Sequence, residues 1–274
     1  MTGSDFDYLC SFLRERCAVV LEPGKEYLVE ARLLPLVRKR NLDSISDIVA
    51  CLRSRSDAEL PAQVVAAMVT TETYFFRDPL TFESLRASVL PDLIARRRDE
   101  RRLNIWCAAC STGQEPYSVA MLLREHFSEL ERWSVSIYAT DISRDVLARA
   151  RQARFTQLEA NRGLPIKLLL KYFKQQGIEW MLSDDIRTMV EFREMNLAAP
   201  WPDLPRMDLI LIRNVMIYFA AESKKSILSR VAELLRPDGY LLLGGAETTF
   251  NLVNCFQRVE KAKSGFYQRI EGAC

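Results

Sequence analysis

Hydrophobic residues recur at helical spacing through the first part of the chain. Phe6, Leu9 and Leu13 lie three or four positions apart, and Ser4 stands before them as the expected helix cap. The strict alternation of apolar and polar residues that marks a strand does not occur in this part. The pattern therefore predicts a small all-helical domain over residues 1–75.

The pattern changes after the charged stretch ARRRDERR. Residues 76–102 are expected to form a linker and a helix that lead into a second domain. Short apolar runs then alternate with amphipathic helices, which indicates an α/β fold with a mostly parallel, doubly wound sheet. The expected strands span 103–108, 135–139, 189–191, 207–212 and 240–243, and the expected helices span 115–127, 145–153 and 221–235.

One stretch within the sheet domain, residues 103–274, does not follow this alternation. Residues 154–192 contain a short helix and a turn at Gly177, so we expect a small inserted β-subdomain with its own antiparallel hairpin. Two apolar runs near the end, 256–259 and 265–269, are expected to form an antiparallel pair of strands at the edge of the sheet.

Composition narrows the class of protein. The chain has 274 residues, of which 49% are hydrophobic and 27% charged, and its net charge of +2 does not demand a nucleic-acid partner. No apolar run approaches the ~18 residues of a membrane span. The start, MTGSDFDYLC, lacks a basic leader, and the seven cysteines are irregularly spaced, so we expect a cytoplasmic protein with reduced thiols. The single histidine, His126, leaves little material for Ser-His, Cys-His or His-metal chemistry.

Two acidic residues follow expected strands. The segment LNIWCAACSTGQEPYS runs from a strand through small residues into a helix that Glu115 begins. Glu115 can be a cofactor ligand or a carboxylate favoured by the helix dipole. Asp141 ends the next strand, where an acidic residue commonly binds a ribose diol, although it could instead cap the following helix.

Two other segments carry candidate chemistry. Asn214 follows the apolar run MDLILIR, where a parallel sheet exposes residues to its ligand crevice, and Tyr218 comes four residues later. The segment VTTETYFFRD joins the two expected domains and includes Arg77, which could be functional or an ordinary salt-bridge residue. Cys107 and Cys110 form a lone C-x-x-C pair, which is too little for a zinc site, and no metal site is expected.

These segments together resemble the CheR-type chemotaxis receptor methyltransferases. The resemblance rests on TTETYFFRD, WCAACSTGQEPYS, ATDIS and RNVMIYF, in this order, and covers residues from about 5 to 270. It implies an N-terminal helical domain followed by a Rossmann-like class I methyltransferase sheet with a small inserted antiparallel subdomain. It also implies S-adenosylmethionine as the cofactor and S-adenosylhomocysteine as the product.

The resemblance assigns site residues position by position. Arg77 and Tyr218 would face the methyl group and the acceptor carboxylate. The positions that would bind the cofactor are Thr71, Thr73, Arg77, Glu115, Asp141, Asn196, Leu197, Asn214 and Val215. This chain departs from the family at Thr71, where asparagine is common, and at Gln114, where a second acid is common.

The implied reaction is methyl transfer to glutamate side chains of methyl-accepting chemotaxis receptors, through recruitment to receptor arrays at the membrane. The partner would be the receptor's cytoplasmic helical domain, and Arg32 and Lys39, two helical turns apart, could steer this acidic target or simply form a solvated face. The turn at residues 174–178 is short, so we expect no tether to a receptor C-terminal pentapeptide. We also expect a monomer.

The alternatives are a non-catalytic cofactor-binding signalling module and a nucleic-acid methyltransferase. The absence of an Asn/Asp-Pro-Pro-Tyr segment argues against the nucleic-acid methyltransferase.

Overall fold

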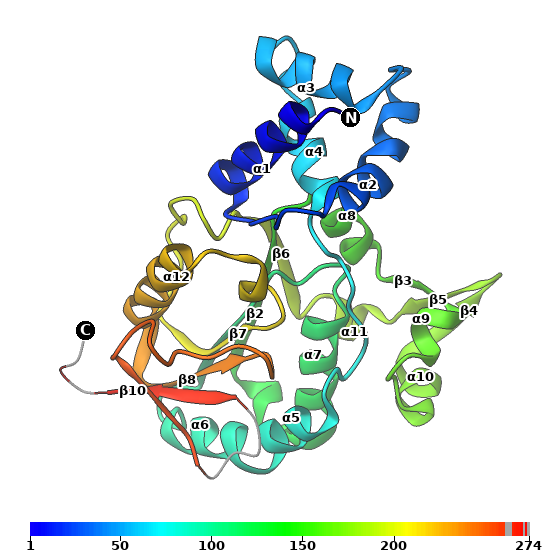
Figure 1. Ribbon diagram of the computed structural model, residues 1–274. Helices are drawn as coiled ribbons and strands as arrows, with labels where there is room; N and C mark the ends of the chain where they lie inside the picture. Colours follow the sequence, from blue (N-terminus) through cyan, green and yellow to red (C-terminus); the bar gives the residue numbers. More distant parts are fainter. Residues whose placement is uncertain (261–264, 271, 273–274) are drawn as a thin grey trace.

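Helices packed around a core of their own make up the amino-terminal part of the chain, as expected. The computed structural model describes residues 1–260, 265–270 and 272. The amino-terminal helices are α1 (Gly3–Cys17), α2 (Glu26–Lys39), α3 (Ile45–Ser54) and α4 (Leu60–Met68), seen at the top of Figure 1. Leu9, Leu13 and Ile48 are fully buried within this group. The fold therefore begins with a helical domain that has its own hydrophobic core.

The expected cap of the first helix was wrong by two residues. Thr2, not Ser4, is the N-cap: its hydroxyl accepts the Asp5 backbone N–H, and the Asp5 carboxylate accepts the Thr2 N–H in return. This reciprocal pairing satisfies two helix-end donors at once. Ser4 is instead the second residue of α1.

A linker and three short helices connect the helical domain to the sheet. After α4 the chain runs without regular structure until α5 (Pro79–Ser84), which continues through a π-helical turn, η1 (Leu85–Val89), into α6 (Leu90–Arg96). Phe82, Leu85 and Leu93 from these helices are buried in the core beneath the sheet. The linker, residues 69–78, is therefore anchored at both ends by packed helices.

The main sheet has seven strands among the described residues, in the order β6-β2-β1-β7-β8-β10-β9. The first five are parallel, and the last two form an antiparallel pair at the edge, as the sequence predicts. The strands are β1 (Arg102–Ala108), β2 (Ser134–Asp141), β6 (Val190–Glu194), β7 (Met207–Ile212), β8 (Leu235–Leu243), β9 (Phe256–Arg258) and β10 (Phe266–Arg269).

The start of β8 differs from the expectation of a strand confined to 240–243. The chain passes from α12 (Ala221–Leu234) directly into the strand at Leu235, although Pro237, Asp238 and Gly239 follow. The pairing of β8 with β7 shifts register at this point. A strand can contain proline and glycine where its pairing is irregular in this way. The turn-forming tripeptide therefore bends the strand and does not precede it.

Helices cover both faces of the sheet, which confirms the doubly wound arrangement. Leu103, Ile105 and Cys107 of β1 point into the core shared with α6 and α7 (Gln114–His126). Trp106 points to the opposite face, in the core shared with α12. This alternation along one strand is the pattern of a sheet buried on both sides. The remaining helices of the sheet domain are α8 (Arg144–Gln152), η2 (Ser128–Arg132) and η3 (Met216–Tyr218).

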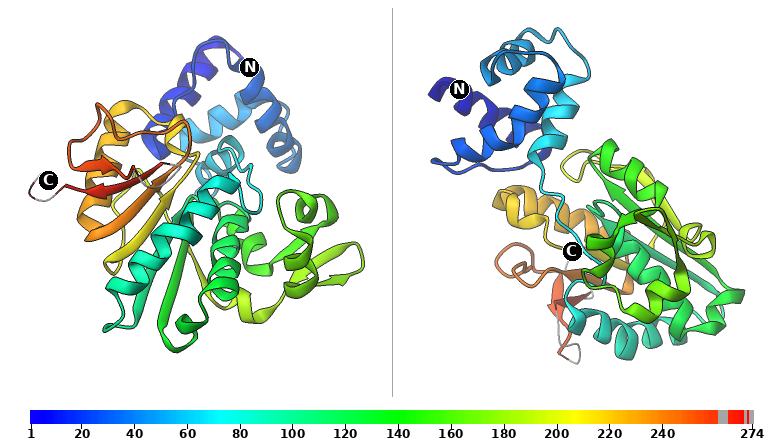
Figure 2. Two further views of the ribbon diagram at one scale, coloured as in Figure 1. Left: turned by 90° about the horizontal axis from the view of Figure 1, so that it is seen from below. Right: turned by 90° about the vertical axis from the view of Figure 1, so that its right-hand side faces the viewer.

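A second, three-stranded antiparallel sheet lies to one side of the main sheet, and Figures 1 and 2 show it projecting with its helices. We call this part the inserted subdomain. Its β4–β5 hairpin turns through Gly177 and Ile178 with Gln176 opposite Glu179, so the turn is as short as expected. Its elements are β3 (Arg154–Thr156), α9 (Gln157–Asn161), α10 (Ile166–Tyr172), β4 (Phe173–Gln176), β5 (Glu179–Leu182) and α11 (Asp184–Arg187).

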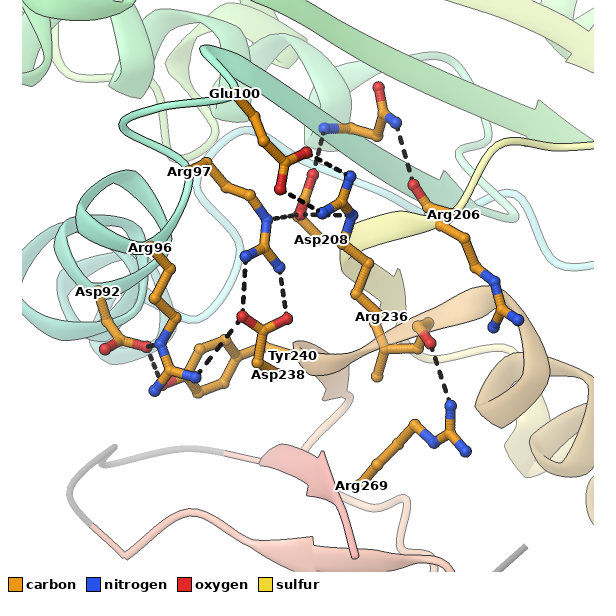
Figure 3. A network of polar contacts seen from close by, with 12 residues as sticks. Asp92, Arg96, Arg97, Glu100, Arg206, Asp208, Arg236, Asp238, Tyr240 and Arg269 are labelled. Atoms are coloured by element: carbon orange, nitrogen blue, oxygen red, sulfur yellow. Dashed lines mark hydrogen bonds and ion pairs between the residues drawn. The ribbon is translucent and has the colours of Figure 1, made fainter. Parts of the chain in front are cut away.

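A network of buried charges fastens the amino-terminal end of the sheet (Figure 3). The Arg97 guanidinium at the end of α6 donates to Asp208 in β7 and to both carboxylate oxygens of Asp238 in β8. Asp208 is fully buried and also accepts the backbone N–H of Asn104 in β1. One helix and three strands are therefore joined through two carboxylates and one guanidinium.

None of the described helices is both long and apolar enough to cross a membrane. Among the cysteines, Cys10, Cys17, Cys51, Cys107 and Cys110 are free. Cys255 takes part in a disulfide, so the expectation of reduced thiols is wrong at this position. Irregular spacing along a chain does not indicate which cysteines the fold brings together.

Candidate functional site

A cavity of about 630 Å³ lies between the helical domain and the carboxyl ends of the central strands. Its lining comes from three parts of the chain: the helical domain with Cys17 and Arg32, the linker with Thr73 and Arg77, and the loops that follow β1, β2 and β7. This is the edge of an open parallel sheet at which ligands bind. The volume falls within the range of about 300–1,000 Å³ that is usual for small-molecule sites.

The structure brings nine of the ten predicted site residues together around this cavity. Thr71 is the exception, because its side chain is exposed and its carbonyl accepts the Ser111 hydroxyl. The residues that line the cavity are Thr73, Arg77, Glu115, Asp141, Asn196, Leu197, Asn214, Val215 and Tyr218.

The turn after β1 brings its backbone directly against the end of β2. Ala109, Ser111 and Gly113 all have positive φ, at 54°, 51° and 92°. A side chain on Gly113 would meet Ala150 and Tyr117 at 3.1 Å, so glycine is required there by conformation and by space. In this turn the Ser111 backbone N–H donates to the Asp141 carboxylate at 2.9 Å.

Asp141 presents a buried carboxylate at the carboxyl end of β2. Its other oxygen accepts the Ser143 N–H at 3.0 Å, and only 8% of the residue is exposed. Ser143, not Asp141, is the N-cap of α8, so the helix-cap alternative for Asp141 does not hold. Burial raises the pKa of Asp141, while the backbone donors around it favour the ionised form.

Glu115 lies in the first turn of α7 and pairs with a buried arginine. The Arg213 guanidinium donates to Glu115 Oε2 at 2.7 Å and to Asp78 Oδ2 at 2.7 Å. It also donates to the backbone carbonyl of Arg77 at 2.8 Å. Burial raises the pKa of Glu115, and Arg213 opposes this shift. Arg213 therefore joins the loop after β7 to both the linker and the turn after β1.

Sequence reasoning gave Arg213 and Asp78 no role. The available signal was position: Arg213 directly follows a strand that is buried along its whole length, where a buried cation needs partners. The side chain of Arg213 is only 2% exposed. Its partners come from distant parts of the sequence, which is why the sequence alone did not identify them.

Asn214 has a strained backbone and an orphaned side-chain oxygen. Its φ is +59°, and its Oδ1 is buried without a hydrogen-bond donor among the described residues. Glu247 holds this loop, because its carboxylate accepts the backbone N–H groups of Asn214, Val215 and Met216 at 2.7–3.0 Å. Buried acceptors are rarely left without a partner, so Asn214 Oδ1 indicates a ligand with a donor.

Arg77 comes from the linker and has no ion pair among the described residues. Its guanidinium donates to the Glu72 carbonyl at 3.2 Å and lies 5.4 Å from the centre of the Tyr74 ring. The salt-bridge alternative for Arg77 therefore finds no support. Tyr218, in η3, also lines the cavity, and its carbonyl accepts the Val20 N–H of the helical domain at 2.9 Å.

The helical domain is attached to the cavity edge by further contacts. Asn196 donates to the Arg16 carbonyl at 2.6 Å and accepts the Ala198 N–H at 2.9 Å, so its amide is occupied by protein. Arg32 donates to Thr70 and to the Met68 carbonyl. The Arg32 guanidinium therefore joins α2 to the end of α4 and to the start of the linker.

The polar groups around the cavity fit an adenosyl cofactor. Asp141, Glu115 and Asn214 Oδ1 present hydrogen-bond acceptors, which suit a ribose diol and an α-ammonium group. Among the described residues, no group of three or more His, Cys, Asp or Glu side chains could hold a metal ion. Burial raises the pKa of the Cys107 and Cys110 thiols, so both stay protonated and inert.

Comparison with known proteins agrees with the fold. The family described as CheR methyltransferase, all-alpha domain, matches residues 4–68, and that described as CheR methyltransferase, SAM binding domain, matches residues 71–265. Chemotaxis protein methyltransferase 1 of Pseudomonas aeruginosa is 38% identical over 271 residues, covering 97% of this chain and 98% of that protein. Chemotaxis protein methyltransferase 1 of Vibrio cholerae is 39% identical over 264 residues, covering 94% and 95%.

Among solved structures, the chain is similar to the glycopeptide N-methyltransferase MtfA, with a TM-score of 0.35 and 18% sequence identity. The match covers 62% of this chain and 55% of that one, and the TM-score is too low to support a conclusion about function. The family matches and the curated relatives cover nearly the whole chain. The chain therefore belongs to the CheR family of S-adenosylmethionine-binding methyltransferases.

Proposed function

We propose that the protein transfers a methyl group from S-adenosylmethionine to glutamate side chains of methyl-accepting chemotaxis receptors. The products are glutamate methyl esters and S-adenosylhomocysteine, and the reaction serves adaptation in chemosensory signalling. Support comes from relatives named chemotaxis protein methyltransferases. The observation that carries the proposal is Arg77, a cation in the wall of the cavity that Tyr218 also lines, without an ion pair among the described residues.

A carboxylate acceptor does not need a general base from the protein. Glutamate has an ordinary pKa of about 4.3, so it is already ionised and nucleophilic at neutral pH. The bound cofactor supplies a methyl group on a positively charged sulfur. The protein supplies alignment and partial removal of water, and alignment alone can contribute on the order of 7–11 kcal/mol. His126 is exposed at the end of α7 and is not among the residues that line the cavity.

We assign roles to four polar residues of the cavity. Asp141 binds the ribose hydroxyls of the cofactor, and Asn214 accepts from its ammonium group through the orphaned Oδ1. Arg77 donates paired hydrogen bonds to the acceptor carboxylate and orients it beside Tyr218. Arg213 is a positioning residue, since it holds Glu115 and the Arg77 backbone.

The remaining predicted site residues contribute to the lining of the cavity or support it through their backbone. Leu197 and Asn196 lie where the adenine is expected, with the Asn196 amide already bonded to Arg16. Val215 borders the methionine portion, and Thr73 lies on the linker side of the cavity. Thr71 acts indirectly, through its carbonyl bond from Ser111, which in turn donates to Asp141.

The receptor substrate is the cytoplasmic helical domain of a chemoreceptor. We propose that the enzyme works in the cytoplasm as a monomer, recruited to receptor arrays, and that it does not act on nucleic acid. The two-residue turn of the β4–β5 hairpin leaves little loop for gripping a receptor C-terminal pentapeptide, so we propose no such tether. Micromolar binding of that pentapeptide to the isolated protein would contradict this part of the proposal.

The test is methyl transfer from radiolabelled S-adenosylmethionine to receptor-containing membranes. We expect label in the receptor band that base treatment releases as methanol, because carboxyl methyl esters are base-labile. Arg77→Ala should lower kcat by about 100-fold, since a misplacement of roughly 1 Å can cost that much, while affinity for S-adenosylhomocysteine stays within about twofold. Cofactor binding without any labelled receptor would indicate a non-catalytic module, and base-stable label in nucleic acid would indicate a different acceptor.

A further inference from the structure

The linker, which carries Arg77, contacts the inserted subdomain through an arginine. Arg162, which directly follows α9, forms an ion pair with the Glu72 carboxylate. Its guanidinium also lies 4.6 Å from the centre of the Tyr74 ring, and the Arg77 guanidinium lies 5.4 Å from the same ring. The Tyr74 ring and Glu72 therefore each contact both arginines, since the Glu72 carbonyl accepts from Arg77.

The backbone of the linker sits directly on the turn that contains Arg162. Gly163 has a φ of +83°, and a Cβ there would lie 2.0 Å from the Phe75 carbonyl oxygen. The Phe75 ring is fully buried and packs edge-on against Phe155 at 4.9 Å and Phe173 at 5.8 Å, both in the inserted subdomain. Such close contact leaves no space for the linker to shift towards the subdomain.

The other end of the linker is fixed by the main sheet. The Phe76 N–H donates to the Ser118 hydroxyl at 2.9 Å, and the Arg77 carbonyl accepts from Arg213 at 2.8 Å. Phe76 and Asp78 have φ values of +48° and +62°, which a loop adopts only when its surroundings hold it. The sheet thus fixes the Arg77 backbone, whereas the direction of its side chain depends on Glu72 and Tyr74.

We propose that Arg162 is a positioning residue that sets the Arg77 side chain from outside the cavity. Arg162 does not line the cavity. It holds Glu72 by charge and Tyr74 by cation–π stacking, and these two groups hold the Arg77 guanidinium in the wall. Through this contact the inserted subdomain contributes to acceptor orientation. The inference rests on the proposed role of Arg77 in binding the acceptor carboxylate.

The variants separate charge, stacking and general stability. Arg162→Ala removes both contacts, while Arg162→Lys keeps a charge for Glu72 but loses the planar group that stacks on Tyr74. Arg154→Ala is the matched control: this arginine belongs to the same subdomain but binds Gln176 and Glu179, away from the linker. Arg77→Ala supplies the background in which Arg162 should no longer matter.

We expect Arg162→Ala to lower kcat for receptor methylation about 10-fold, part of the roughly 100-fold that a 1 Å misplacement can cost. The dissociation constant of S-adenosylhomocysteine and the Tm should match wild type, Arg162→Lys should recover part of the rate, and Arg154→Ala should change nothing. In the Arg77→Ala background, Arg162→Ala should have no further effect. Equal loss in both backgrounds, or a loss of cofactor affinity and Tm together with kcat, would overturn the inference.

Hydrogen exchange gives a readout that does not depend on the reaction. In Arg162→Ala, the amides of residues 72–74 should exchange faster than in wild type, while those of the turn after β1 should not change. Unchanged exchange in this segment would refute the positioning role. If Arg77→Ala kept full turnover, the proposed function of Arg77 would fail, and the exchange measurement would still decide whether Arg162 orders the linker.

Discussion

The two ends of the main sheet differ in whether their buried polar groups have hydrogen-bond partners. At the amino end, Arg97, Asp208 and Asp238 satisfy one another directly (Figure 3). At the carboxyl end, Asn214 Oδ1 and Arg213 Nε are buried without a partner among the described residues. The Arg236 Nε at the amino end, which also lacks a hydrogen bond, still lies 3.4 Å from an Asp208 oxygen.

Non-glycine residues with positive φ occur at both ends, with Arg101 at the amino end, but more of them lie around the cavity. Ala109, Ser111 and Asn214, which surround the cavity, all have positive φ without being glycines. Such residues are uncommon and cost free energy, which other parts of the fold must offset. The closed end stabilises the strands, and the open end keeps acceptors and strained loops ready for a ligand. The unpaired polar groups and the strained loops thus indicate, independently of any similar protein, that the carboxyl end of the sheet carries the function.

The largest expected effect is on stability at the closed end. Asp208→Ala leaves the Arg97 guanidinium buried beside only one of its two carboxylates, and breaking a buried pair in this way typically costs about 3–5 kcal/mol. Urea unfolding should show this loss, while the folded fraction binds S-adenosylhomocysteine as wild type does. A loss below about 1 kcal/mol, the level of a surface ion pair, would contradict the contrast between the two ends.

A smaller and different effect is expected at the open end. Asp141→Asn keeps the shape of the side chain but removes the charge that is proposed to bind the ribose. Hydrogen bonds to charged groups contribute about 1.5–3 kcal/mol, so the dissociation constant of S-adenosylhomocysteine should rise by roughly 10- to 150-fold. Calorimetric titration measures this. Unchanged affinity would remove Asp141 from the binding site.

The smallest expected effects have opposite signs in the pH dependence of stability. Burial raises the pKa of Asp141 above its ordinary 3.8, so its stabilising contribution is greatest below pH 3.8 and declines as pH rises through the folded value. Arg97 lowers the pKa of Asp238 below 3.8, so that contribution is present above pH 3.8 and is lost as pH falls through the folded value.

Urea unfolding of Asp141→Asn and Asp238→Asn between pH 3 and 6 checks these signs. Each unit of pKa shift corresponds to about 1.4 kcal/mol. The free-energy difference from wild type should change with pH in opposite directions for the two variants. Parallel changes would show that the two aspartates do not have the contrasting environments described above.

The sequence predicts most of the fold because the relevant signals are local. The apolar runs at Leu103 and Met207, the helical spacing of Phe6, Leu9 and Leu13, and the turn at Gly177 each depend on neighbouring residues. The errors are local too. The cap fell on Ser4 because an alternative cap and its acidic partner, Thr2 and Asp5, lie almost at the chain start. The β8 strand began early because its pairing tolerates a bulge.

The site was less accessible to sequence reasoning. Glu115, Asp141 and Asn214 follow strands, so their meeting at one edge of the sheet follows from topology. Arg213 pairs with Asp78 and Glu115, and Arg162 with Glu72, across 90 or more positions of the chain. No spacing rule connects residues so far apart. Their roles appear only when the fold places the linker between the main sheet and the inserted subdomain.

The central claim is that an adenosyl compound binds over the carboxyl ends of β1, β2 and β7. The most direct measurement is a crystal structure of the protein with S-adenosylhomocysteine. We predict ligand density in the cavity, with the ribose at Asp141, the ammonium group at Asn214 and the sulfur directed towards Arg77 and Tyr218. Density for the ligand elsewhere, with this cavity holding only water, would contradict the account.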